Sequence, residues 1–346
     1  MKHLFTAIFC LMGLILSAQQ PALPITSYDY AIPENNVSAI AIGMGAMNVT
    51  NTDDPFASFS NPALLASGES TQLFTSFRLA NEKNISFGEA AQISNFLRDK
   101  QFKYFTLVAK QAAFSYQPVA KVNISAWNAA QDSSKYFDYQ LDKVQFSLGV
   151  TDKNWPDLSG GLNLKYLSGR LVYLAERKVG NIMARDAFID DKVKGFSTDL
   201  GITYKTGDII MGATAYDLIS RLWWENYSSK SIQRRIGIGS QYGSGSSKVT
   251  MGVQSKISRQ PETTYHIGYV NTFSWDSTDF ADNSTIKQGL DVRIGVYSKD
   301  FYGTDNINFT MGGGYYYKLF RFDFSLNNSG LRLADSEYLF ALGAGF

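Results

Sequence analysis

The chain has 346 residues, with 32 basic and 31 acidic side chains, two histidines and one cysteine. A charge so close to balance lacks the basic excess of nucleic-acid-binding proteins, so nucleic acid is excluded as a partner. The single cysteine excludes an internal disulfide and a multi-cysteine metal site. Tyr and Phe are abundant, Gly is frequent and Pro is scarce, which is typical of many strands joined by tight turns.

The first residues are typical of a secretory leader. Lys2 precedes an apolar run over residues 4–16, and small residues follow at a cleavage position. The run is shorter than the about 20 residues that a spanning helix needs. We therefore predict a signal peptide over residues 1–18 and an exported mature chain. Cys10 lies inside the apolar run, which argues against a lipoprotein acylation site, and the mature chain would contain no cysteine.

A segment rich in small residues follows the leader. Gly43-Met44-Gly45 is half of a dinucleotide fingerprint, but it lacks the third glycine and a βαβ setting, which argues against nucleotide binding. Asp53 and Asp54 suit either a cation site or a capped turn, and adjacent carboxylates point apart in an extended chain, which favours capping. Glycines let a backbone pass close to a wall, as a segment threaded inside a barrel must.

From residue 71 onward apolar and polar residues alternate, which is the period of strands with one apolar face. Phe320, Phe322 and Phe324, for example, oppose Arg321 and Asp323. The pattern marks fifteen candidate strands, near residues 71–79, 101–109, 111–118, 120–129, 138–150, 159–168, 196–205, 208–217, 233–243, 247–256, 262–271, 289–298, 306–317, 319–327 and 338–346. It predicts a transmembrane antiparallel β-barrel of about 14 strands, since bacterial barrels use an even number.

The connections predict an orientation. Short joints at 206–207 and 243–246 alternate with long stretches at 170–195 and 218–232. Barrels keep short turns on the periplasmic side and long loops outside. The stretch 272–288 departs from this rule, being long where a short turn is expected. We expect residues 170–195 to form a loop that folds over the rim as a lid, or a helical insertion that binds a partner.

Two further features lie in the strand region. Trp223 and Trp224 follow a strand, and either a membrane interface or a packed loop core would suit them. His266 lies in an alternating run without triad spacing around it, which favours an inward strand position over a catalytic role. The sequence contains no acid–base, nucleophile or metal-ligand constellation, so we predict no catalytic residue, no metal and no cofactor.

The last nine residues form the clearest strand, because large apolar side chains occupy every second position: Tyr338, Phe340, Leu342, Ala344 and Phe346. The last strand of a soluble sandwich is the alternative. A strand with an outward apolar face suits a barrel wall, and the terminal Phe346 resembles the C-terminal assembly signal of bacterial outer-membrane barrels. We therefore expect outer-membrane lipids and the barrel-assembly machinery as partners.

The order of motifs over residues 36–66 resembles the N-terminal hatch of FadL-type outer-membrane proteins, especially the PorV/PorQ-like branch. A glycine-rich stretch, an Asp-Asp-Pro and an Asn-Pro-Ala precede the first strand directly. The hatch-motif residues are Gly43, Gly45, Asp53, Asp54, Pro55, Asn61, Pro62 and Ala63. Ala46, Met47 and Asn48 depart from the family pattern, which leaves the path of the hatch unspecified.

The resemblance implies an all-β protein of the bacterial outer membrane. A barrel over residues 70–346 would be plugged by a hatch over residues 19–69. Asn61, Pro62 and Ala63 would brace that hatch against the wall, because Asn61 offers two donors and an acceptor and Pro62 fixes the direction of the chain.

Two functions compete under this resemblance. In the first, the barrel passes fatty-acid-like hydrophobic small molecules through an apolar pocket and a gap in the wall, as FadL-type transporters do. In the second, it is a PorV-like component of type IX protein secretion that binds exported proteins by its loops. The first predicts an apolar cavity above the hatch, and the second predicts an exposed apolar loop surface. We place transport first; a structural barrel without cargo is a third possibility.

Overall fold

The computed structural model describes residues 36–68, 70–79, 100–128, 130–257, 261–278, 285–299, 307–329 and 336–346. The predicted signal peptide over residues 1–18 lies outside the described residues, as do residues 19–35 and 69 of the predicted hatch. Within the described part of the chain, no helix is long and apolar enough to cross a membrane.

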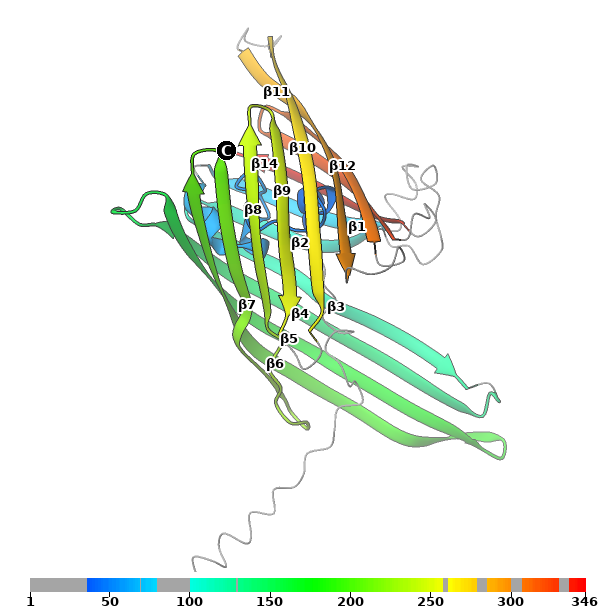
Figure 1. The fold of residues 1–346 in the computed structure, drawn as a ribbon. Coiled ribbons are helices and arrows are strands. Elements are labelled where there is room, and N and C mark those ends of the chain that lie inside the picture. The colour runs from blue at the N-terminus through cyan, green and yellow to red at the C-terminus, as the bar shows by residue number, and fades with distance from the viewer. Residues whose placement is uncertain are drawn as a thin grey trace, which may run out of the picture.

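The described residues contain fourteen antiparallel strands that close into one barrel, because the first strand pairs with the last (Figure 1). The predicted all-β antiparallel barrel is therefore confirmed. The strands are β1 (Gln72–Leu79), β2 (Lys100–Ala109), β3 (Ala112–Trp127), β4 (Ser133–Thr151), β5 (Leu158–Val179), β6 (Ile182–Thr206), β7 (Ile209–Trp224), β8 (Arg235–Ser244), β9 (Ser247–Lys256), β10 (Thr263–Thr278), β11 (Thr285–Lys299), β12 (Ile307–Tyr317), β13 (Phe320–Ser329) and β14 (Ser336–Gly345).

The prediction of two separate strands at 111–118 and 120–129 was wrong, because both belong to β3. Pro118 lacks a backbone N–H, and the pairing of β3 with β4 shifts register between Pro118 and Ala120. The chain nevertheless continues in the same direction past the irregularity. This merger explains why fifteen candidate segments give fourteen strands.

The prediction that residues 170–195 form a lid loop or a helical insertion was also wrong. These residues continue β5 and β6 as one long hairpin, which turns at Gly180, a residue with φ of +65°. The stretch 272–288 likewise consists largely of strand, because β10 and β11 pair as far as Thr278 and Thr285. It therefore no longer contradicts the rule of short turns at that end of the barrel.

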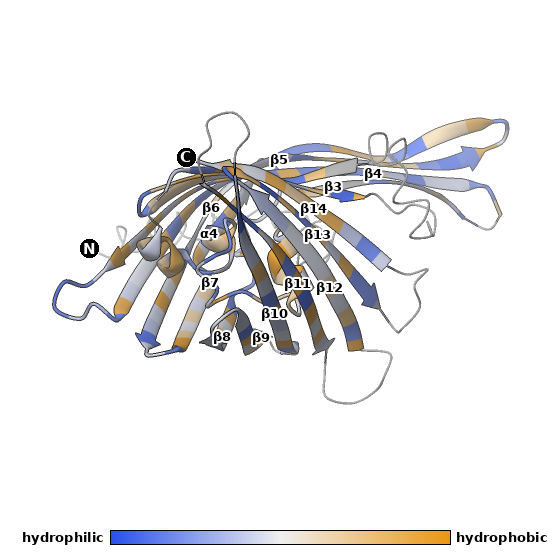
Figure 2. Ribbon diagram, turned by 90° about the horizontal axis from the view of Figure 1, so that it is seen from above, coloured by the Kyte–Doolittle hydropathy of each residue, from blue (hydrophilic) through white to orange (hydrophobic). Residues whose placement is uncertain are grey.

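The outer face of the barrel carries an apolar belt. On β4 the side chains of Val144, Phe146 and Leu148 are 37%, 45% and 41% exposed, whereas the intervening Gln145 and Ser147 face inward and are buried. Figure 2 shows the same alternation as bands of hydropathy along the strands. Large apolar side chains exposed around the wall are what a lipid-facing surface requires, so the barrel is built to span a membrane.

Beyond this belt the polarity of β4 reverses. Tyr139 and Leu141 point inward and are buried, while Gln140 on the outer face is exposed. Here β3, β4, β5 and β6 run past the ends of their neighbours and form a protruding sheet (Figure 1). We call the barrel end from which this sheet projects the mouth. The polar outer residues of β4 in this stretch, Asp138, Gln140 and Asp142, indicate that the protruding sheet stands outside the membrane.

The residues before β1 lie within the ring of strands, as the position of α4 in Figure 2 shows. This inner segment, residues 36–68, contains three short helices: α3 (Ala39–Gly43), α4 (Ala57–Ser60) and the 3-10 helix η1 (Pro62–Ser67). The helix α3 contacts β11 to β14, and η1 contacts β4, β5 and β6. The two ends of the inner segment therefore contact opposite parts of the barrel wall.

Candidate functional site: the lumen and the inner segment

The first half of the inner segment is held by Asp54. One carboxylate oxygen accepts hydrogen bonds from the Ser38 hydroxyl (2.6 Å) and the Asn48 amide, and the other accepts from the Phe56 N–H (2.9 Å). Ser38 in turn caps α3 by accepting from the Ala41 N–H (3.0 Å). Burial raises the pKa of Asp54, although the three hydrogen bonds oppose that rise. Among the described residues no acidic or histidine cluster suits a metal ion.

Asp53 behaves differently from its neighbour. It is exposed and forms an ion pair with Lys248 of β9. The two adjacent carboxylates thus point apart although the chain turns at Thr52 and Asp53, and of the two only Asp54 bonds within the inner segment. Pro55, the third residue of this motif, is buried two positions before the start of α4.

Asn61 joins the second half of the inner segment to the wall. Its side-chain oxygen caps η1 by accepting from the Ala63 N–H (3.0 Å), and its amide nitrogen donates to Val49 O (2.8 Å) and to Ile202 O of β6 (3.2 Å). The side chain is fully buried. One asparagine therefore satisfies backbone groups from two parts of the inner segment and from one strand.

A track of glycines lets the inner segment lie directly on the wall. On every strand from β4 to β12, a Cβ added to one glycine would come within 2.0 to 3.3 Å of an atom of the inner segment. These residues are Gly149, Gly161, Gly201, Gly212, Gly239, Gly252, Gly268, Gly295 and Gly312. Six of these glycines meet the backbone of the inner segment, where any larger residue would push the two backbones apart: Gly149, Gly161, Gly212, Gly268, Gly295 and Gly312. Gly43 and Gly45 of the predicted motif meet this track at Gly312 and Gly295.

Buried ion pairs support the wall on both sides of the inner segment. Arg293 lies 2.6 Å from Asp291 and 2.8 Å from Asp323, and Arg321 bonds to the same two carboxylates. This network stands beneath α3, since a Cβ on Gly43 would lie 3.3 Å from the Arg293 Cβ. Here the opposite charges are matched and hydrogen-bonded, as buried charges must be.

A second network faces α4 on the opposite wall. Lys165 bonds to Asp199 (2.6 Å) and Asp217 (3.0 Å). Asn163 connects this network to the inner segment by donating to Asp199 (2.8 Å) and to Ser58 O (2.9 Å). Lys165 is consequently neutralised by two carboxylates.

A cavity of about 370 Å³ lies between the inner segment and the mouth. The inner segment contributes Ile42, Met47 and Phe59 to its lining, and the wall adds Leu167 and other side chains. Its charged and titratable lining residues are Arg78, Lys143, Lys165, Asp217, Arg235, His266 and Glu337. The apolar chamber expected for transport is therefore wrong in part, because charged groups share the lining with apolar ones.

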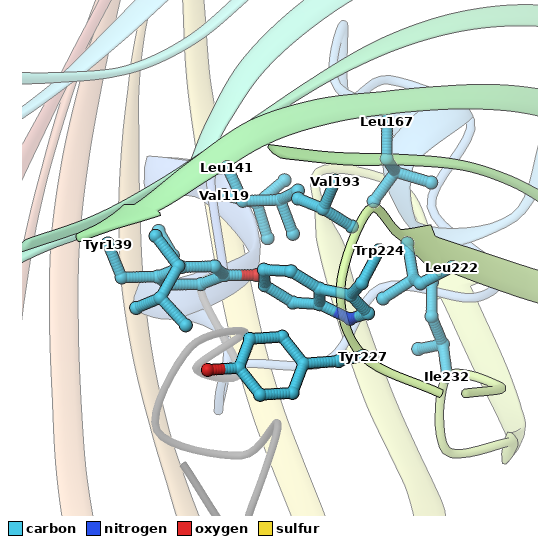
Figure 3. Packing of buried hydrophobic residues seen from close by; sticks show 11 residues of the cluster. Val119, Tyr139, Leu141, Leu167, Val193, Leu222, Trp224, Tyr227 and Ile232 are labelled. Atoms are coloured by element: carbon cyan, nitrogen blue, oxygen red, sulfur yellow. The ribbon is translucent and has the colours of Figure 1, made fainter. Parts of the chain in front are cut away.

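An apolar cluster joins the protruding sheet to the connection after β7 (Figure 3). The connection after β7 turns inward, so that Trp224, Tyr227 and Ile232 pack against Tyr139 and other side chains of that sheet. The rings of Trp224 and Tyr139 stack with centroids 6.0 Å apart. Asp191 fixes this connection by accepting from the backbone N–H groups of Glu225 and Asn226.

The wall has a seam beside the cavity. In the described residues β2 pairs with β3 only where Phe105–Ala109 faces Ala112–Tyr116. Beyond Tyr116, β3 pairs with β4 alone, and Gln117 and Val119 from this stretch line the cavity. Pro118 at this point cannot donate to a ladder.

The remaining sequence candidates fall into place along the wall. Trp224 is 7% exposed inside the mouth cluster, as a packed core requires, whereas Trp223 is 48% exposed on the outer face. His266 faces inward, with Nδ1 2.6 Å from Gly45 O and Nε2 2.7 Å from the Thr264 hydroxyl. It therefore contacts the inner segment at an inward strand position, as expected.

The terminal strand shows the predicted alternation. Leu342 and Phe346 are exposed on the outside, and Leu339 and Ala341 are buried against the inner segment. Tyr338 departs from the pattern, because it is buried with Leu326 and other apolar residues.

Several site residues were not found from the sequence. Lys143 and Lys165 differ in partner, and that difference depends on carboxylates contributed by distant strands. The glycine track could have been predicted in part, because an alignment of the strands shows glycines at inward positions of successive strands. No pattern within one strand, however, shows which glycines meet the inner segment.

No protein-family model and no curated protein matches the sequence. The fold is similar to that of many solved structures, and three of them are described here. The Ralstonia pickettii toluene transporter TbuX has a TM-score of 0.55 at 12% identity, covering 91% of this chain and 99% of that one. A Pseudomonas aeruginosa FadL homologue has a TM-score of 0.51 at 11% identity, covering 92% of this chain and 99% of that one. The P. putida toluene transporter TodX has a TM-score of 0.50 at 12% identity, covering 89% of this chain and 98% of that one.

These similarities define the class of fold. The chain is a closed barrel of 14 antiparallel strands with the fold of FadL-type barrels. At these identities the similarity establishes the fold alone, and function has to be argued from the lumen.

Proposed function

We propose that the protein is a bacterial outer-membrane transporter for hydrophobic, fatty-acid-like small molecules. The cavity of about 370 Å³ between the mouth and the inner segment carries this proposal, because it offers a small molecule a site inside the wall. TbuX and TodX, which share the fold, are toluene transporters. The exposed apolar belt suits the membrane setting.

We propose further that residues 19–69 act as a hatch and that the cargo leaves sideways. The glycine track places the inner segment against the wall from β4 to β12, which favours a fixed seal over a passage along the barrel axis. The seam between β2 and β3 adjoins the cavity, because Gln117 and Val119 line it. Cargo would enter at the mouth, reach the cavity and pass through this seam.

Uptake of a radiolabelled fatty acid by cells that carry the protein tests the proposal. Gln117 is 3% exposed and lines the cavity beside the seam, so Gln117→Trp should fill the path and reduce uptake to that of cells without the protein. Lys194→Trp, on the exposed outer face, is the matched control and should retain uptake. Equal uptake by cells with and without the wild-type protein would overturn the transport function.

The PorV-like role in type IX secretion is the second candidate. The protruding sheet favours it, because Phe137 and Ile189 are only partly buried there and extend the apolar cluster beyond the barrel. A sheet of this kind outside the membrane offers a surface to an exported protein. Mild extraction followed by mass spectrometry should then recover a secreted protein with the wild-type chain and lose it after Phe137→Ser.

We also propose that the terminal strand is the assembly signal, with Tyr338, Phe340, Leu342 and Phe346 as its residues. The exposure of Leu342 and Phe346 on the outer face of β14 supports this role. Deletion of Phe346 should lower the amount of folded, heat-modifiable protein in the outer membrane. Unchanged amounts would contradict an assembly role for the terminal aromatic residue.

A further inference from the structure

We propose that the free edge of β3, residues 120–127 on the protruding sheet, binds an extended strand of another protein outside the membrane. The added strand would lie on the side of β3 that β2 occupies nearer the barrel. This inference goes beyond the transport function and stands without it. For the second candidate function, it names how an exported protein would be held.

The hydrogen bonds between β3 and β4 show which backbone groups of β3 are unpaired. Asn128, directly after β3, donates its N–H to Ser133 O at 3.0 Å, so the even-numbered residues from Ala120 onward turn their N–H and C=O groups toward β4. Backbone groups alternate between the two sides of a strand, so the odd-numbered residues turn theirs the other way. We call these the edge residues: Lys121, Asn123, Ser125 and Trp127. On their side of β3 no described strand pairs with them.

The opposite edge of the protruding sheet, formed by β6, is less open. The pairing of β6 with β5 shifts register beside Asp186, and a bulge of this kind interrupts the row of backbone groups. Nearer the barrel, Glu225 donates its N–H to Lys192 O at 3.2 Å, which closes that end of the edge. Bulges and coverings are the usual protection of sheet edges against added strands. Over residues 120–127, by contrast, β3 pairs with β4 in unbroken register.

The two faces of the protruding sheet define the chemistry of the partner strand. On the inner face Tyr139 is buried in the apolar cluster, and Phe137 packs against that cluster but is only partly buried. In the ladder Tyr139 lies opposite Val122, and Phe137 lies opposite Ile124. A strand added to the other side of β3 would therefore place every second side chain beside this apolar face and the others beside polar outer residues such as Asp138. The partner is thus an extended segment in which apolar and polar residues alternate.

A second copy of this chain suits the edge less well than a separate protein. Copies in one membrane project their protruding sheets to the same side, so two β3 strands would run outward together and meet in parallel. Every ladder between the described strands is antiparallel. A separate protein can approach β3 in the antiparallel direction, which favours another chain outside the membrane as the occupant.

Hydrogen exchange resolved to single amides tests the edge and its occupant together. The probe is a peptide with the sequence of residues 133–142, because this stretch of β4 already pairs with β3 on the other side. A peptide of the same composition without the alternation is its control. In the full-length protein in a nonionic maltoside, the amides of the edge residues should exchange rapidly, and those of the even-numbered residues between them should exchange slowly. The probe should slow the exchange of the edge amides at least about tenfold, and the control peptide should not.

Two substitutions of Ser125 separate backbone pairing from side-chain contact. Ser125→Pro removes an edge N–H without breaking the ladder with β4, because an edge strand tolerates proline where the N–H faces solvent. It should weaken binding of the probe at least about tenfold, since a carbonyl of the peptide loses its donor. Ser125→Ala, the matched control, keeps the N–H and should bind the probe as the wild type does. In both variants the even-numbered amides should stay protected, which shows that the sheet is folded.

The opposing outcomes are distinguishable. Equal binding of the probe by Ser125→Pro and Ser125→Ala, or failure of the probe to slow any edge amide, would overturn strand addition at β3 and leave the transport function standing. A dimer of the wild-type protein that Ser125→Pro dissociates would assign the edge to a second copy and overturn the separate partner. A secreted protein that is lost after Phe137→Ser but retained by Ser125→Pro would support the second candidate function and overturn its binding at this edge.

Discussion

Single residues decide how the inner segment is held, and neighbouring residues of one type take different roles. Asp53 is exposed and pairs with Lys248, whereas Asp54 is buried and accepts three hydrogen bonds within its own segment. The sequence predicts that the two carboxylates point apart for an extended chain, and they do so here although Thr52 and Asp53 form a turn. Which of the two carboxylates is buried depends on contacts with Ser38 and Asn48, and the local sequence around Asp53 and Asp54 does not show these contacts.

Asn61→Ala should loosen the inner segment while leaving the barrel assembled. The variant loses the cap of η1 and the bonds to Val49 and Ile202, and these buried groups are left without partners at a cost of about 1–3 kcal/mol. Single-channel recordings in planar bilayers should show more frequent openings than the wild type. Recordings indistinguishable from the wild type would show that Asn61 does not secure the seal.

Asp54 should make the stability of the inner segment depend on pH. Its pKa is raised in the folded protein, so the folded state binds the proton more tightly than the unfolded state. The stabilisation is therefore complete below the unfolded value of about 4 and is lost as pH rises through the raised pKa. Hydrogen exchange over residues 38–60, corrected for intrinsic rates, should show weaker protection on that rise. Asp54→Asn should remove the dependence; an unchanged profile in this variant would assign it to another group.

At the scale of elements, the strands are far more predictable than their lengths. Inside the apolar belt the alternation of β13 or β4 is imposed by lipid on one side and the lumen on the other. Beyond the belt that constraint ends, and the polarity of β4 reverses near Leu141. The β5–β6 hairpin lies largely in this region, which is why its sequence resembles a loop. The inward turn after β7 is set by Asp191 of another strand.

Two adjacent glycines of β5 test the close approach of the inner segment to the wall. A Cβ on Gly161 would lie 2.3 Å from the Ala63 nitrogen, whereas a Cβ on Gly160 meets nothing within 4 Å. Gly161→Ala should therefore cost about 1–3 kcal/mol of stability by overpacking, and Gly160→Ala should be neutral or slightly stabilising because it restricts the unfolded chain. Thermal unfolding of the two variants can be monitored by the heat-modifiable electrophoretic mobility of the protein, and their unfolding midpoints can then be compared. Equal midpoints would contradict the tight contact at Gly161.

At the scale of the whole molecule, the barrel combines a lipid-facing belt with a sheet that stands in water. The same substitution should therefore change the stability by different amounts in the belt and on the protruding sheet. Ile238 on β8 is 59% exposed within the belt, and Ile182, where the β5–β6 hairpin turns, is 69% exposed on the protruding sheet. A soluble protein would expose both to water, so an arginine at either position would be tolerated.

In a membrane the two substitutions separate. Ile238→Arg should destabilise the barrel by about 2–4 kcal/mol, since it places a charge among acyl chains, while Ile182→Arg should cost almost nothing. Urea unfolding in lipid vesicles measures both, and in a nonionic detergent the difference should shrink because the micelle deforms around the charge. A large effect at Ile182 would place the protruding sheet within the bilayer. The mouth and the cavity below it would then also lie deeper in the membrane. This pair of variants therefore determines the height, relative to the bilayer, at which any cargo must enter.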